Sequence, residues 1–383
     1  MNELYNIRQD CRFLILDRPC KFHKKEGVVC NSCSYFKKIH TRILVIKLDA
    51  LGDVLRTMAI LPPLKKKYPD SHITWITREN AVPLFKNVEL VDEVLDYSDP
   101  VATHLLQTST FDLVINPDAN KASALMASVV KAKEKKGFYL GSSTEIIASN
   151  DRTYEWFLMG INDGIKKKNT KTYQQIILDM LDLDENDSYI PLSLSSKEKE
   201  NSENFCKGKG FDGKKTIIGL NIGAGGRWQN KVWPIGHYEE LIKGLLKRNM
   251  QILLLGGVNE KKRLAALNNR FADRIASGSY DNSLREFFSV LNVCDVLVSS
   301  DTMAAHAGLA LGKKLVVLFG PTSINEFEVY GRGIKLCSDI DCIVCYRPTC
   351  DKKPNCMDLL KPEVVENAVA RFFKNDKLVN YKE

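Results

Sequence analysis

One turn of this chain has the composition of an anion-binding site. A buried-strand pattern at 295–298 leads through Ser-Ser-Asp-Thr, 299–302, into a helix of small residues that ends at Gly312. A helix start exposes backbone N–H groups and the positive end of the helix dipole, so it can hold a phosphate or pyrophosphate. The residues expected at this site are Asp301, Thr302, Met303, Ala304, Ala305 and His306.

Asp53 is a candidate for proton transfer. It stands in Leu51-Gly52-Asp53, directly after the first strand pattern, 42–46. Open parallel sheets bind ligands at the carboxyl ends of their strands. Asp at such a turn also caps helices well. A carboxylate there can instead act as a general base when a substrate hydroxyl lies within hydrogen-bond reach. The residue alone leaves both roles open.

A glycine-rich loop at 223–231 follows the first strand pattern of the second half of the chain. Glycines let backbone amides approach a phosphate, and Arg227 and Lys231 add positive charge beside Gly226. The loop is neither a P-loop nor a dinucleotide fingerprint. The first turn at 51–53 lacks that fingerprint too, which disfavours a nicotinamide-dependent oxidoreductase.

Glu260 is the fourth candidate. It closes the stretch Gly256-Gly257-Val258-Asn259-Glu260, after a strand pattern at 251–255. A carboxylate after the second strand of a nucleotide-binding half suits ribose hydroxyls. The alternative is a first-turn Glu that the helix dipole favours.

Cysteines gather at both ends of the chain, where nine of the eleven lie. In a reducing compartment clustered cysteines indicate metal binding more than disulfides. Four thiolates favour a structural zinc ion, with iron or an iron–sulfur cluster left open and unliganded thiols as the alternative. One candidate set is Cys342, Cys345, Cys350 and Cys356. The other is Cys11, Cys20, Cys30 and Cys33, with His23 between them in the sequence.

Length and charge limit the class of protein. A chain of 383 residues is too long for one typical core and indicates two domains. No apolar run reaches the roughly 18 residues that span a membrane, and the polar start is not a signal peptide, so we expect a cytoplasmic protein. The net charge is +8, and residues 1–47 contribute ten Lys/Arg against four Asp/Glu. This basic segment suits phosphates, nucleic acid or an anionic membrane face, or is a solvated tail.

Alternating strand and helix patterns must position these motifs. Such alternation predicts parallel sheets with helices on both faces, an α/β class with two doubly wound halves. The expected strands are 42–46, 72–76, 93–95, 113–115, 216–220, 251–255, 295–298 and 315–319. The expected helices are 53–61, which Pro62-Pro63 should kink or end, then 81–86, 101–107, 121–131, 172–183, 195–210, 235–248, 261–271, 284–293 and 362–373.

The four motifs resemble those of glycosyltransferase family 9, the heptosyltransferases, and the resemblance spans roughly residues 41–375. The glycine loop ends in Lys231-Val232-Trp233-Pro234, as the family's loop ends in Lys-x-Trp-Pro. The resemblance implies a GT-B fold, two Rossmann-like domains facing across a cleft. It implies inverting transfer of a heptose or similar sugar from an ADP-sugar to a lipopolysaccharide core-type acceptor, without a cofactor for catalysis.

The resemblance also implies roles for the motif residues. Asp53 would be the general base, Lys231 and the amides of 302–305 would hold the pyrophosphate, and Glu260 would bind the ribose. Met303 departs from the family, in which Gly is common at this position. Its side chain is expected to crowd the pyrophosphate side, which leaves the donor sugar open.

The predicted layout has four parts. They are a basic Cys-rich segment (1–40), an acceptor domain (41–205), a nucleotide-sugar domain (206–340), and a Cys finger with a last helix (341–383). The implied partners are a nucleotide-sugar donor, ADP-heptose first, and an anionic glycolipid acceptor. Peripheral contact with the inner face of the membrane and the oligomeric state stay open.

Two alternatives were weighed against this function. Part of the family carries a Cys finger, including protein heptosyltransferases that hold iron there. One alternative is therefore a protein O-heptosyltransferase with an iron-binding finger. The other is a metal-dependent nucleic-acid-binding protein. It is disfavoured because the lead-in lacks a helix-in-groove or aromatic-stacking pattern, and we do not expect nucleic acid as a partner.

Overall fold

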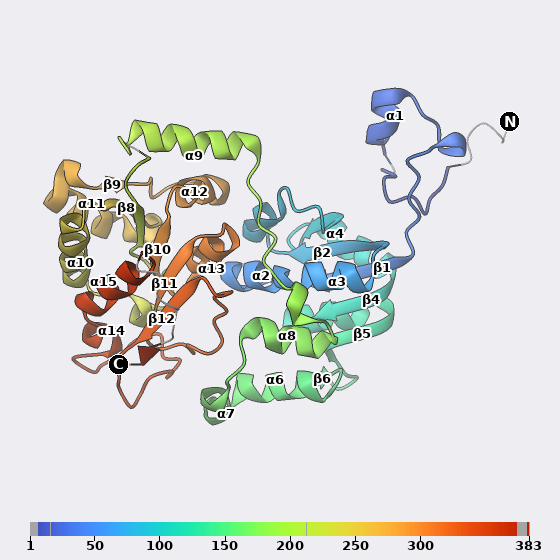
Figure 1. Ribbon diagram of the computed structural model, residues 1–383. Coiled ribbons are helices and arrows are strands. Elements are labelled where there is room, and N and C mark those ends of the chain that lie inside the picture. The colour runs from blue at the N-terminus through green and yellow to red at the C-terminus, as the bar shows by residue number, and fades with distance from the viewer. Residues whose placement is uncertain (1–6, 16, 212, 374–380, 383) are drawn as a thin grey trace.

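The computed structural model describes residues 7–15, 17–211, 213–373 and 381–382. It has two α/β domains side by side, with a small N-terminal segment set apart from both (Figure 1). Each domain is built on a sheet with helices on its two faces, which agrees with the predicted doubly wound architecture. Among the described residues, no helix combines the length and apolar character needed to cross a bilayer.

The N-terminal domain contains a sheet of order β3-β2-β1-β4-β5-β6. All neighbouring strands run parallel except β5 and β6, which are antiparallel. The strands are β1 Thr41–Ile46, β2 Ser71–Thr77, β3 Glu93–Asp96, β4 Thr110–Asn116, β5 Lys131–Leu140 and β6 Ile146–Ala148. Strand β1 is almost entirely apolar and lies in the middle of this sheet, so its carboxyl end opens beside the Asp53 turn.

The helices of this domain begin with the Asp53 turn. The chain runs through α2 and a 3-10 turn into α3, whose first turn takes Pro62 and Pro63 where a missing N–H breaks no helical bond. The helical segments are α2 Leu51–Thr57, η2 Met58–Ile60, α3 Leu61–Lys67, η3 Glu79–Phe85, α4 Pro100–Thr108, α5 Lys121–Val129, α6 Asp151–Ile161, α7 Asp163–Lys168, α8 Tyr173–Leu181 and η4 Glu185–Asp187.

The C-terminal domain has a parallel sheet of order β13-β12-β11-β10-β7-β8-β9. The strands are β7 Ile217–Asn221, β8 Gln251–Leu255, β9 Ala276–Ser277, β10 Val296–Ser300, β11 Lys314–Phe319, β12 Gly333–Cys337 and β13 Tyr381–Lys382. The helical segments are η5 Gln229–Lys231, α10 Ile235–Lys247, η6 Val258–Glu260, α11 Lys261–Phe271, η7 Ala272–Arg274, α12 Leu284–Leu291, α13 Met303–Ala310, α14 Cys356–Leu359 and α15 Pro362–Arg371. The central strands β7 and β10 are fully buried and end at the two loops expected to bind the anion.

The helix α9, Ser196–Gly208, runs without a break across the predicted domain boundary between residues 205 and 206. It packs against α12 of the C-terminal domain. There Glu198 and Arg285 form an ion pair of 2.7 Å between side chains that are both nearly buried. The helix therefore belongs with the C-terminal domain, and the connection between the domains precedes it.

The sequence did not predict strands β5, β6, β9, β12 and β13, and two of them show why. Strand β5 carries five lysines or glutamates in its first six residues, because it lies near the edge of its sheet and much of it is exposed. The predicted helix 121–131 accordingly ends at Val129. Strand β12 contains Lys335, which is buried because its Nζ donates to the carbonyl oxygens of Ile324 and Phe327 at 2.9 and 3.1 Å.

Candidate active site

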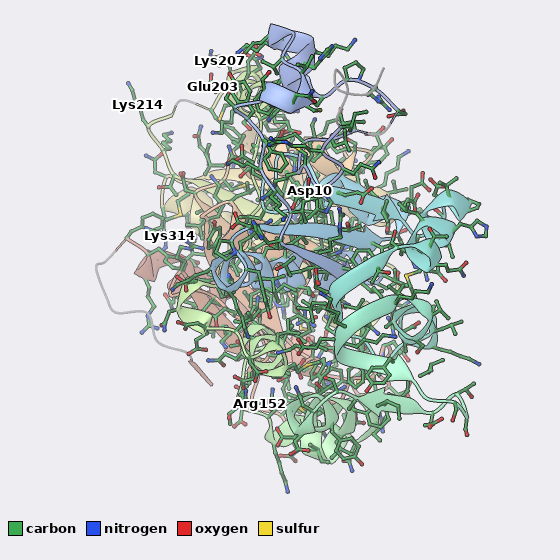
Figure 2. All side chains as sticks on the ribbon, turned by 90° about the vertical axis from the view of Figure 1, so that its right-hand side faces the viewer. Asp10, Arg152, Glu203, Lys207, Lys214 and Lys314 are labelled. Carbon is green, nitrogen blue, oxygen red and sulfur yellow. The ribbon has the colours of Figure 1, made fainter. Side chains whose placement is uncertain are left out.

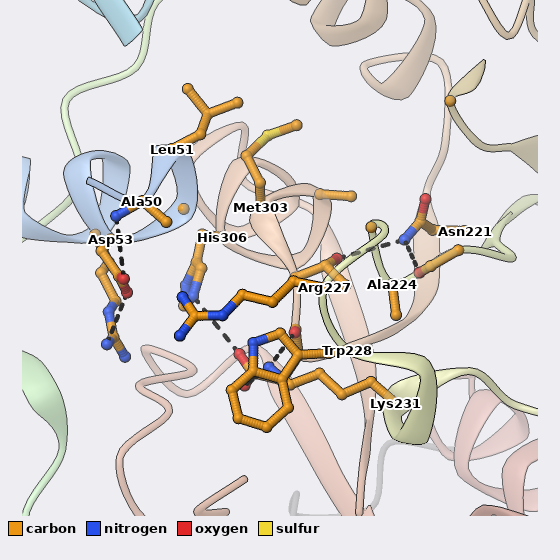
Figure 3. A pocket seen from close by; sticks show the side chains of 18 of the residues that line it. Ala50, Leu51, Asp53, Asn221, Ala224, Arg227, Trp228, Lys231, Met303 and His306 are labelled. Carbon is orange, nitrogen blue, oxygen red and sulfur yellow. Dashed lines mark hydrogen bonds and ion pairs between the residues drawn. The ribbon is translucent and has the colours of Figure 1, made fainter. Parts of the chain in front are cut away.

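A cavity of about 870 Å³ lies between the two domains, and all four sequence motifs reach it (Figure 3). The N-terminal domain contributes the start of α2, with Gly52 and Asp53. The C-terminal domain contributes the glycine loop, the Gly256–Glu260 stretch and the start of α13. Of the predicted site residues, Gly226 and Ala305 do not line the cavity. The structure thus brings motifs up to about 250 residues apart in the sequence to one cleft.

Asp53 is the third residue of α2, and its carboxylate is held from two sides. Oδ1 lies 2.8 Å from Nη2 of Arg56, and Oδ2 accepts the backbone N–H of Ala50 at 3.3 Å. Burial alone would raise the pKa of Asp53, but the charges of Arg56 and Lys47 outweigh it and hold this pKa below its usual value. Asp53 is therefore ionised at neutral pH, as a proton acceptor must be.

Arg56 was missed by the sequence reading, although the i, i+3 spacing to Asp53 could have revealed it. Its guanidinium lies over the ring of Tyr173, 3.7 Å from the centroid. The Tyr173 hydroxyl in turn forms a 2.7 Å hydrogen bond with Oγ1 of Thr57. The Tyr173 amide donates to the Glu326 carbonyl of the other domain at 2.9 Å. Helix α8 therefore fixes Arg56 and links this support to the C-terminal domain.

Lys47 adds a second positive charge behind Asp53. Its Nζ pairs with Asp118 at 2.7 Å and also donates to the carbonyl oxygen of Asp49, and only 3% of the Lys47 side chain is exposed. The charge of Asp118, together with Tyr173 and Asp53, raises the pKa of Lys47 although burial opposes this. The turn at the carboxyl end of β1 is thus held by buried charge pairs.

Lys231 and Asp301 form the centre of the opposite wall. Lys231 Nζ lies 2.7 Å from Asp301 Oδ2 and donates to the Asp301 carbonyl at 3.0 Å. Thr322 Oγ1 donates to the same carboxylate oxygen at 2.8 Å. Burial opposes ionisation of Asp301, but Lys231 and the nearby His306 lower its pKa well below the usual range. Asp301 therefore orients Lys231 toward the cavity and is itself anionic.

His306 is neutral at physiological pH. Burial, followed by the charge of Arg56, lowers its pKa to about 4, although Asp301 and Asp53 oppose this. Its ring stacks on Phe327 with a centroid distance of 4.5 Å. Nε2 lies 3.8 Å from Asp301, and buried Nδ1 has no hydrogen-bond partner among the described residues. A neutral imidazole that lines the cavity can donate or accept one hydrogen bond from a ligand.

The start of α13 keeps part of the predicted anion site. Thr302 is the N-cap, and Thr302, Met303 and Ala304 line the cavity. Ala305 is a correction: its amide donates to the Thr302 carbonyl at 3.1 Å, and the residue is fully buried, so this amide is occupied by the helix. The first-turn groups available to an anion are therefore those of 302–304.

Met303 packs where α13 meets α2. A Cβ placed on Gly52 would lie 3.4 Å from the Met303 backbone nitrogen, so the two helix starts are in close contact. Figure 3 places the Met303 side chain toward Leu51 and away from Lys231. The expected crowding by Met303 thus falls at the α2 side of the cavity.

Glu260 both caps its own turn and faces the cavity. Its Oε2 accepts the Gly257 amide at 2.9 Å, which caps the following helix, and the side chain also lines the cavity. Gly223 leaves the room for this, because a Cβ there would overlap the Glu260 carboxyl group. The second carboxylate oxygen can therefore accept a ligand hydroxyl while the first holds the loop.

The glycine loop presents its charges from an exposed turn. Gly225 has φ of +69°, a conformation that favours glycine. Arg227 extends into the cavity, and its guanidinium and Lys231 Nζ lie 5.7 and 5.3 Å from the Trp228 ring (Figure 3). Trp233 of the same motif is fully buried and its Nε1 donates to the Leu360 carbonyl at 2.9 Å, so it is a core residue.

Tyr346 comes into the cavity from the Cys-rich loop, which the sequence reading did not foresee. Its hydroxyl donates to Glu326 Oε1 at 2.9 Å, and both side chains line the cavity. Lys166 of α7 lies 4.1 Å from the Tyr346 ring centroid. The loop that holds the C-terminal cysteines therefore also forms one wall of the site.

The C-terminal cysteines lie near one another behind this wall. Burial, then the charge of Cys345 and also those of Cys350 and Cys342, raises the pKa of Cys356 to about 11. Across the described ranges, no three or more His, Cys, Asp or Glu side chains form a group set to hold a metal ion. Metal binding by either cysteine set therefore stays a prediction.

Comparisons with known proteins agree with these motifs. A family model described as glycosyltransferase family 9 (heptosyltransferase) matches residues 102–355. Lipopolysaccharide heptosyltransferase 1 of Pseudomonas aeruginosa is 24% identical over 341 residues, which cover 82% of this chain and 88% of the relative. Lipopolysaccharide heptosyltransferase 2 of Salmonella typhimurium is 23% identical over 310 residues, covering 74% and 83%.

Solved structures share the GT-B fold. A family 9 glycosyltransferase from Veillonella parvula has a TM-score of 0.72 at 18% identity, covering 89% of this chain and 99% of its own. The ADP-heptose heptosyltransferase II of E. coli has a TM-score of 0.64 at 19% identity, covering 87% and 98%. TibC, an iron-containing dodecameric glycosyltransferase from enterotoxigenic E. coli, has a TM-score of 0.55 at 10% identity, covering 88% and 77%.

Proposed function

Because the chain belongs to glycosyltransferase family 9, we propose that it is an inverting glycosyltransferase that moves a heptose, or a similar sugar, from an ADP-sugar to a lipopolysaccharide core-type acceptor. The observation that carries the proposal is the cavity between the domains. A carboxylate lies on one wall, and a lysine and a helix start lie on the other. This is the arrangement that transfer between a hydroxyl and a sugar pyrophosphate requires.

On the acceptor side, Asp53 removes the proton of the attacking hydroxyl. The hydroxyl oxygen forms a bond to the anomeric carbon of the sugar, the bond from that carbon to the pyrophosphate breaks, and ADP leaves with the electron pair. The proton ends on an Asp53 carboxylate oxygen. Arg56 and the Ala50 amide hold that carboxylate in place, so it meets the hydroxyl in one orientation.

On the donor side, the negative charge that develops on ADP meets fixed donors. Lys231 supplies a cation that Asp301 already orients, and the backbone amides of 302–304, at the start of α13, donate hydrogen bonds to the phosphates. Groups that are in place before the reaction stabilise the leaving group without reorganisation. Glu260 accepts a ribose hydroxyl through its free carboxylate oxygen, and Arg227 closes over the phosphates from the exposed loop. ADP-heptose is the proposed donor, because two E. coli relatives of this fold are ADP-heptose or ADP-bound heptosyltransferases.

The proposed acceptor is an anionic glycolipid, and the protein then acts at the cytoplasmic side of the membrane by peripheral contact. The excess of basic residues in the first 47 supports this placement, because cations are attracted to an anionic membrane face.

A structural metal is proposed at Cys342, Cys345, Cys350 and Cys356, whose thiols act on one another's charge. Four thiolates suit zinc or iron, and a divalent ion removes their mutual repulsion. When bound, the metal supplies rigidity to the loop that carries Tyr346. The iron-containing glycosyltransferase among the fold neighbours supports a second candidate function, heptose transfer to protein with an iron-holding finger.

A transfer assay tests the function. Purified protein is incubated with ADP-heptose and a heptose-free lipopolysaccharide core lipid, and ADP release and lipid mass are followed. We expect ADP release that depends on the lipid, a lipid mass gain of one heptose, and turnover about 10²–10⁴-fold slower with the Asp53→Asn variant. ADP-heptose consumed only with a protein acceptor would select the second candidate, and binding of neither ADP nor ADP-heptose would overturn both.

A further inference from the structure

The N-terminal segment, the described residues between 7 and 40, has no core of its own. None of these residues is buried. Its regular structure is one short helix, α1 Lys21–Glu26, a single turn, η1 Cys30–Ser32, and a bridge between Cys11 and Lys38. A segment of this length cannot gain enough from apolar burial to fix its shape, and such units ordinarily need a disulfide or a metal.

Four cysteines from separate parts of this segment meet at one cavity. The cavity has a volume of about 600 Å³ and is lined by Cys11, Cys20, Cys30 and Cys33 together with His23. Each cysteine is half-buried and carries a free thiol. The segment thus folds so that its four cysteines, spread over residues 11–33, face a shared space.

The local backbone accounts for this convergence. Cys20 caps α1, and its carbonyl accepts the Lys24 amide at 3.0 Å. Gly27, with φ of +70°, ends the helix and turns the chain back. The Cys33 amide then donates to the Cys30 carbonyl at 3.5 Å, so the two cysteines of the C-x2-C pair lie on one tight turn. A helix start and a tight turn therefore each contribute thiols to the cavity.

Aromatic and basic residues surround the same cavity. The Phe22 ring stacks on Tyr35 at 4.0 Å and meets Phe13 edge-on at 4.9 Å. All three rings line the cavity beside the thiols. Lys/Arg outnumber Asp/Glu by eight to three between residues 7 and 40. Four thiolates around a divalent ion carry a net charge of −2, and this excess of cations offsets it.

We propose that Cys11, Cys20, Cys30 and Cys33 bind a structural metal centre, a zinc ion or an iron–sulfur cluster held by four thiolates, and that this centre supplies the core that the segment lacks. Among the described residues, no three or more His, Cys, Asp or Glu side chains are close enough together to hold a metal ion. Metal binding must therefore move the four thiols closer to one another. No buried packing in the segment resists that movement. Binding releases the thiol protons and couples the fold of the segment to the metal.

The centre lies away from the transferase cleft. Figures 1 and 2 show the segment projecting from the N-terminal domain, with Asp10 labelled beside its connection to that domain. The segment attaches through Arg12, whose Nε lies 2.6 Å from Asp92 Oδ1, and Lys65 shares that carboxylate at 3.2 Å. The His40 amide donates to the Asp70 carbonyl at 3.3 Å. The metal therefore orders an attached module and takes no part in sugar transfer.

Metal analysis of the full chain tests the proposal. Protein purified anaerobically is assayed for zinc and iron, and its visible absorption separates a cluster from zinc. Cys20→Ser and Cys33→Ser are compared with Cys206→Ser, a half-buried cysteine outside both sets, and with Cys345→Ser. We expect Cys20→Ser and Cys33→Ser each to lose one zinc equivalent, or one cluster, relative to wild type. Cys206→Ser should keep its full metal content. The double variant Cys33→Ser/Cys345→Ser should lose as much metal as the two single variants together.

Two further readouts separate the metal site from general misfolding. Proteolytic cleavage between residues 7 and 40 should become faster in Cys33→Ser, while ADP affinity should stay within about twofold because the donor site lies in the other domain. Wild-type protein with neither zinc nor iron would overturn the proposal. Unchanged metal content in both Cys20→Ser and Cys33→Ser would overturn it as well, whatever the outcome for transferase activity.

Discussion

Gly223→Ala should weaken ADP binding indirectly, because the new side chain would displace Glu260. Gly223 is the first residue of the glycine loop, and a Cβ at this position would overlap the carboxyl group of Glu260. The alanine must therefore displace the Glu260 side chain. This movement breaks the 2.9 Å hydrogen bond to the Gly257 amide and takes the carboxylate away from the proposed ribose position.

The size of the effect follows from those two losses. A hydrogen bond to a charged group contributes about 1.5–3 kcal/mol, so loss of the ribose contact should raise the Kd for ADP roughly 10- to 100-fold. Overpacking of a buried contact costs about 1–3 kcal/mol of folding stability. The variant should thus unfold at lower denaturant concentration while keeping the slope of the transition.

The loop offers a matched control. A Cβ on Gly226, three residues further on, would lie 3.4 Å from Nδ2 of Asn259, an ordinary contact. Gly226→Ala should therefore bind ADP nearly as wild type does. Isothermal calorimetry with ADP compares both variants with Glu260→Ala and with the double variant Gly223→Ala/Glu260→Ala.

The double variant tests the route of the effect. If Gly223 acts through Glu260, adding Gly223→Ala to Glu260→Ala should change the Kd by less than about twofold, because the displaced carboxylate is already gone. Fully additive losses would refute this reasoning. So would wild-type affinity in Gly223→Ala.

Asp53→Asn should slow transfer about 10²–10⁴-fold with ADP affinity nearly unchanged, and near-normal turnover in the variant would contradict the assignment. Because the pKa of Asp53 lies below the usual 3.8, the wild-type rate should fall through protonation of Asp53 only below about pH 4. Lys231→Ala should weaken ADP binding roughly tenfold or more, because it removes the cation at the pyrophosphate, and unchanged calorimetry would place the lysine outside the site. Arg285→Ala should destabilise the fold by about 1.5–3 kcal/mol at pH 7, measured by urea unfolding, because the nearly buried Glu198 carboxylate loses its Arg285 hydrogen bonds and keeps only contacts such as those with Lys86 and Ser195. The Arg285 hydrogen bonds hold the pKa of Glu198 far below its usual 4.5, so the difference between wild type and variant should be complete above about pH 4.5 and shrink below it; a gap independent of pH would contradict the pairing. Cys345→Ser should reduce bound zinc or iron and thermal stability more than ADP affinity, and a metal-free wild type with full stability would reject the C-terminal centre.

The elements that the sequence predicted are those with a strong local pattern. The strand β8, Gln251–Leu255, and the helix α11, Lys261–Phe271, have the predicted bounds, because an apolar run and a 3.6-residue period are visible in the chain itself. Strand β5 and strand β12 were missed, since a charged edge strand and a buried lysine with carbonyl partners contradict those patterns. Their place in the sheets depends on neighbours far away in the sequence.

The candidate site divides in the same way. The turn before α13 and the glycine loop were visible as motifs, because the groups proposed to bind an anion there are adjacent in the chain. The occupied amide of Ala305 was not foreseen, since it depends on how tightly the first turn of the helix closes. The place of Tyr346 in the cavity was not foreseen either, because the sequence of its loop has no pattern that indicates where the loop lies in the fold.

The sequence by itself determined the two sheets, the order of the motifs and the family, since these follow from periodicity and from residues that are neighbours in the chain. Only the tertiary structure decided that Asp53 of one domain faces Lys231 and Asp301 of the other across a cavity of about 870 Å³. It also decided that Arg56, fixed by Tyr173, holds the Asp53 carboxylate. The physical reason is that such contacts arise from strand order and from the packing of α2 against α13, which bring together side chains that no local pattern relates.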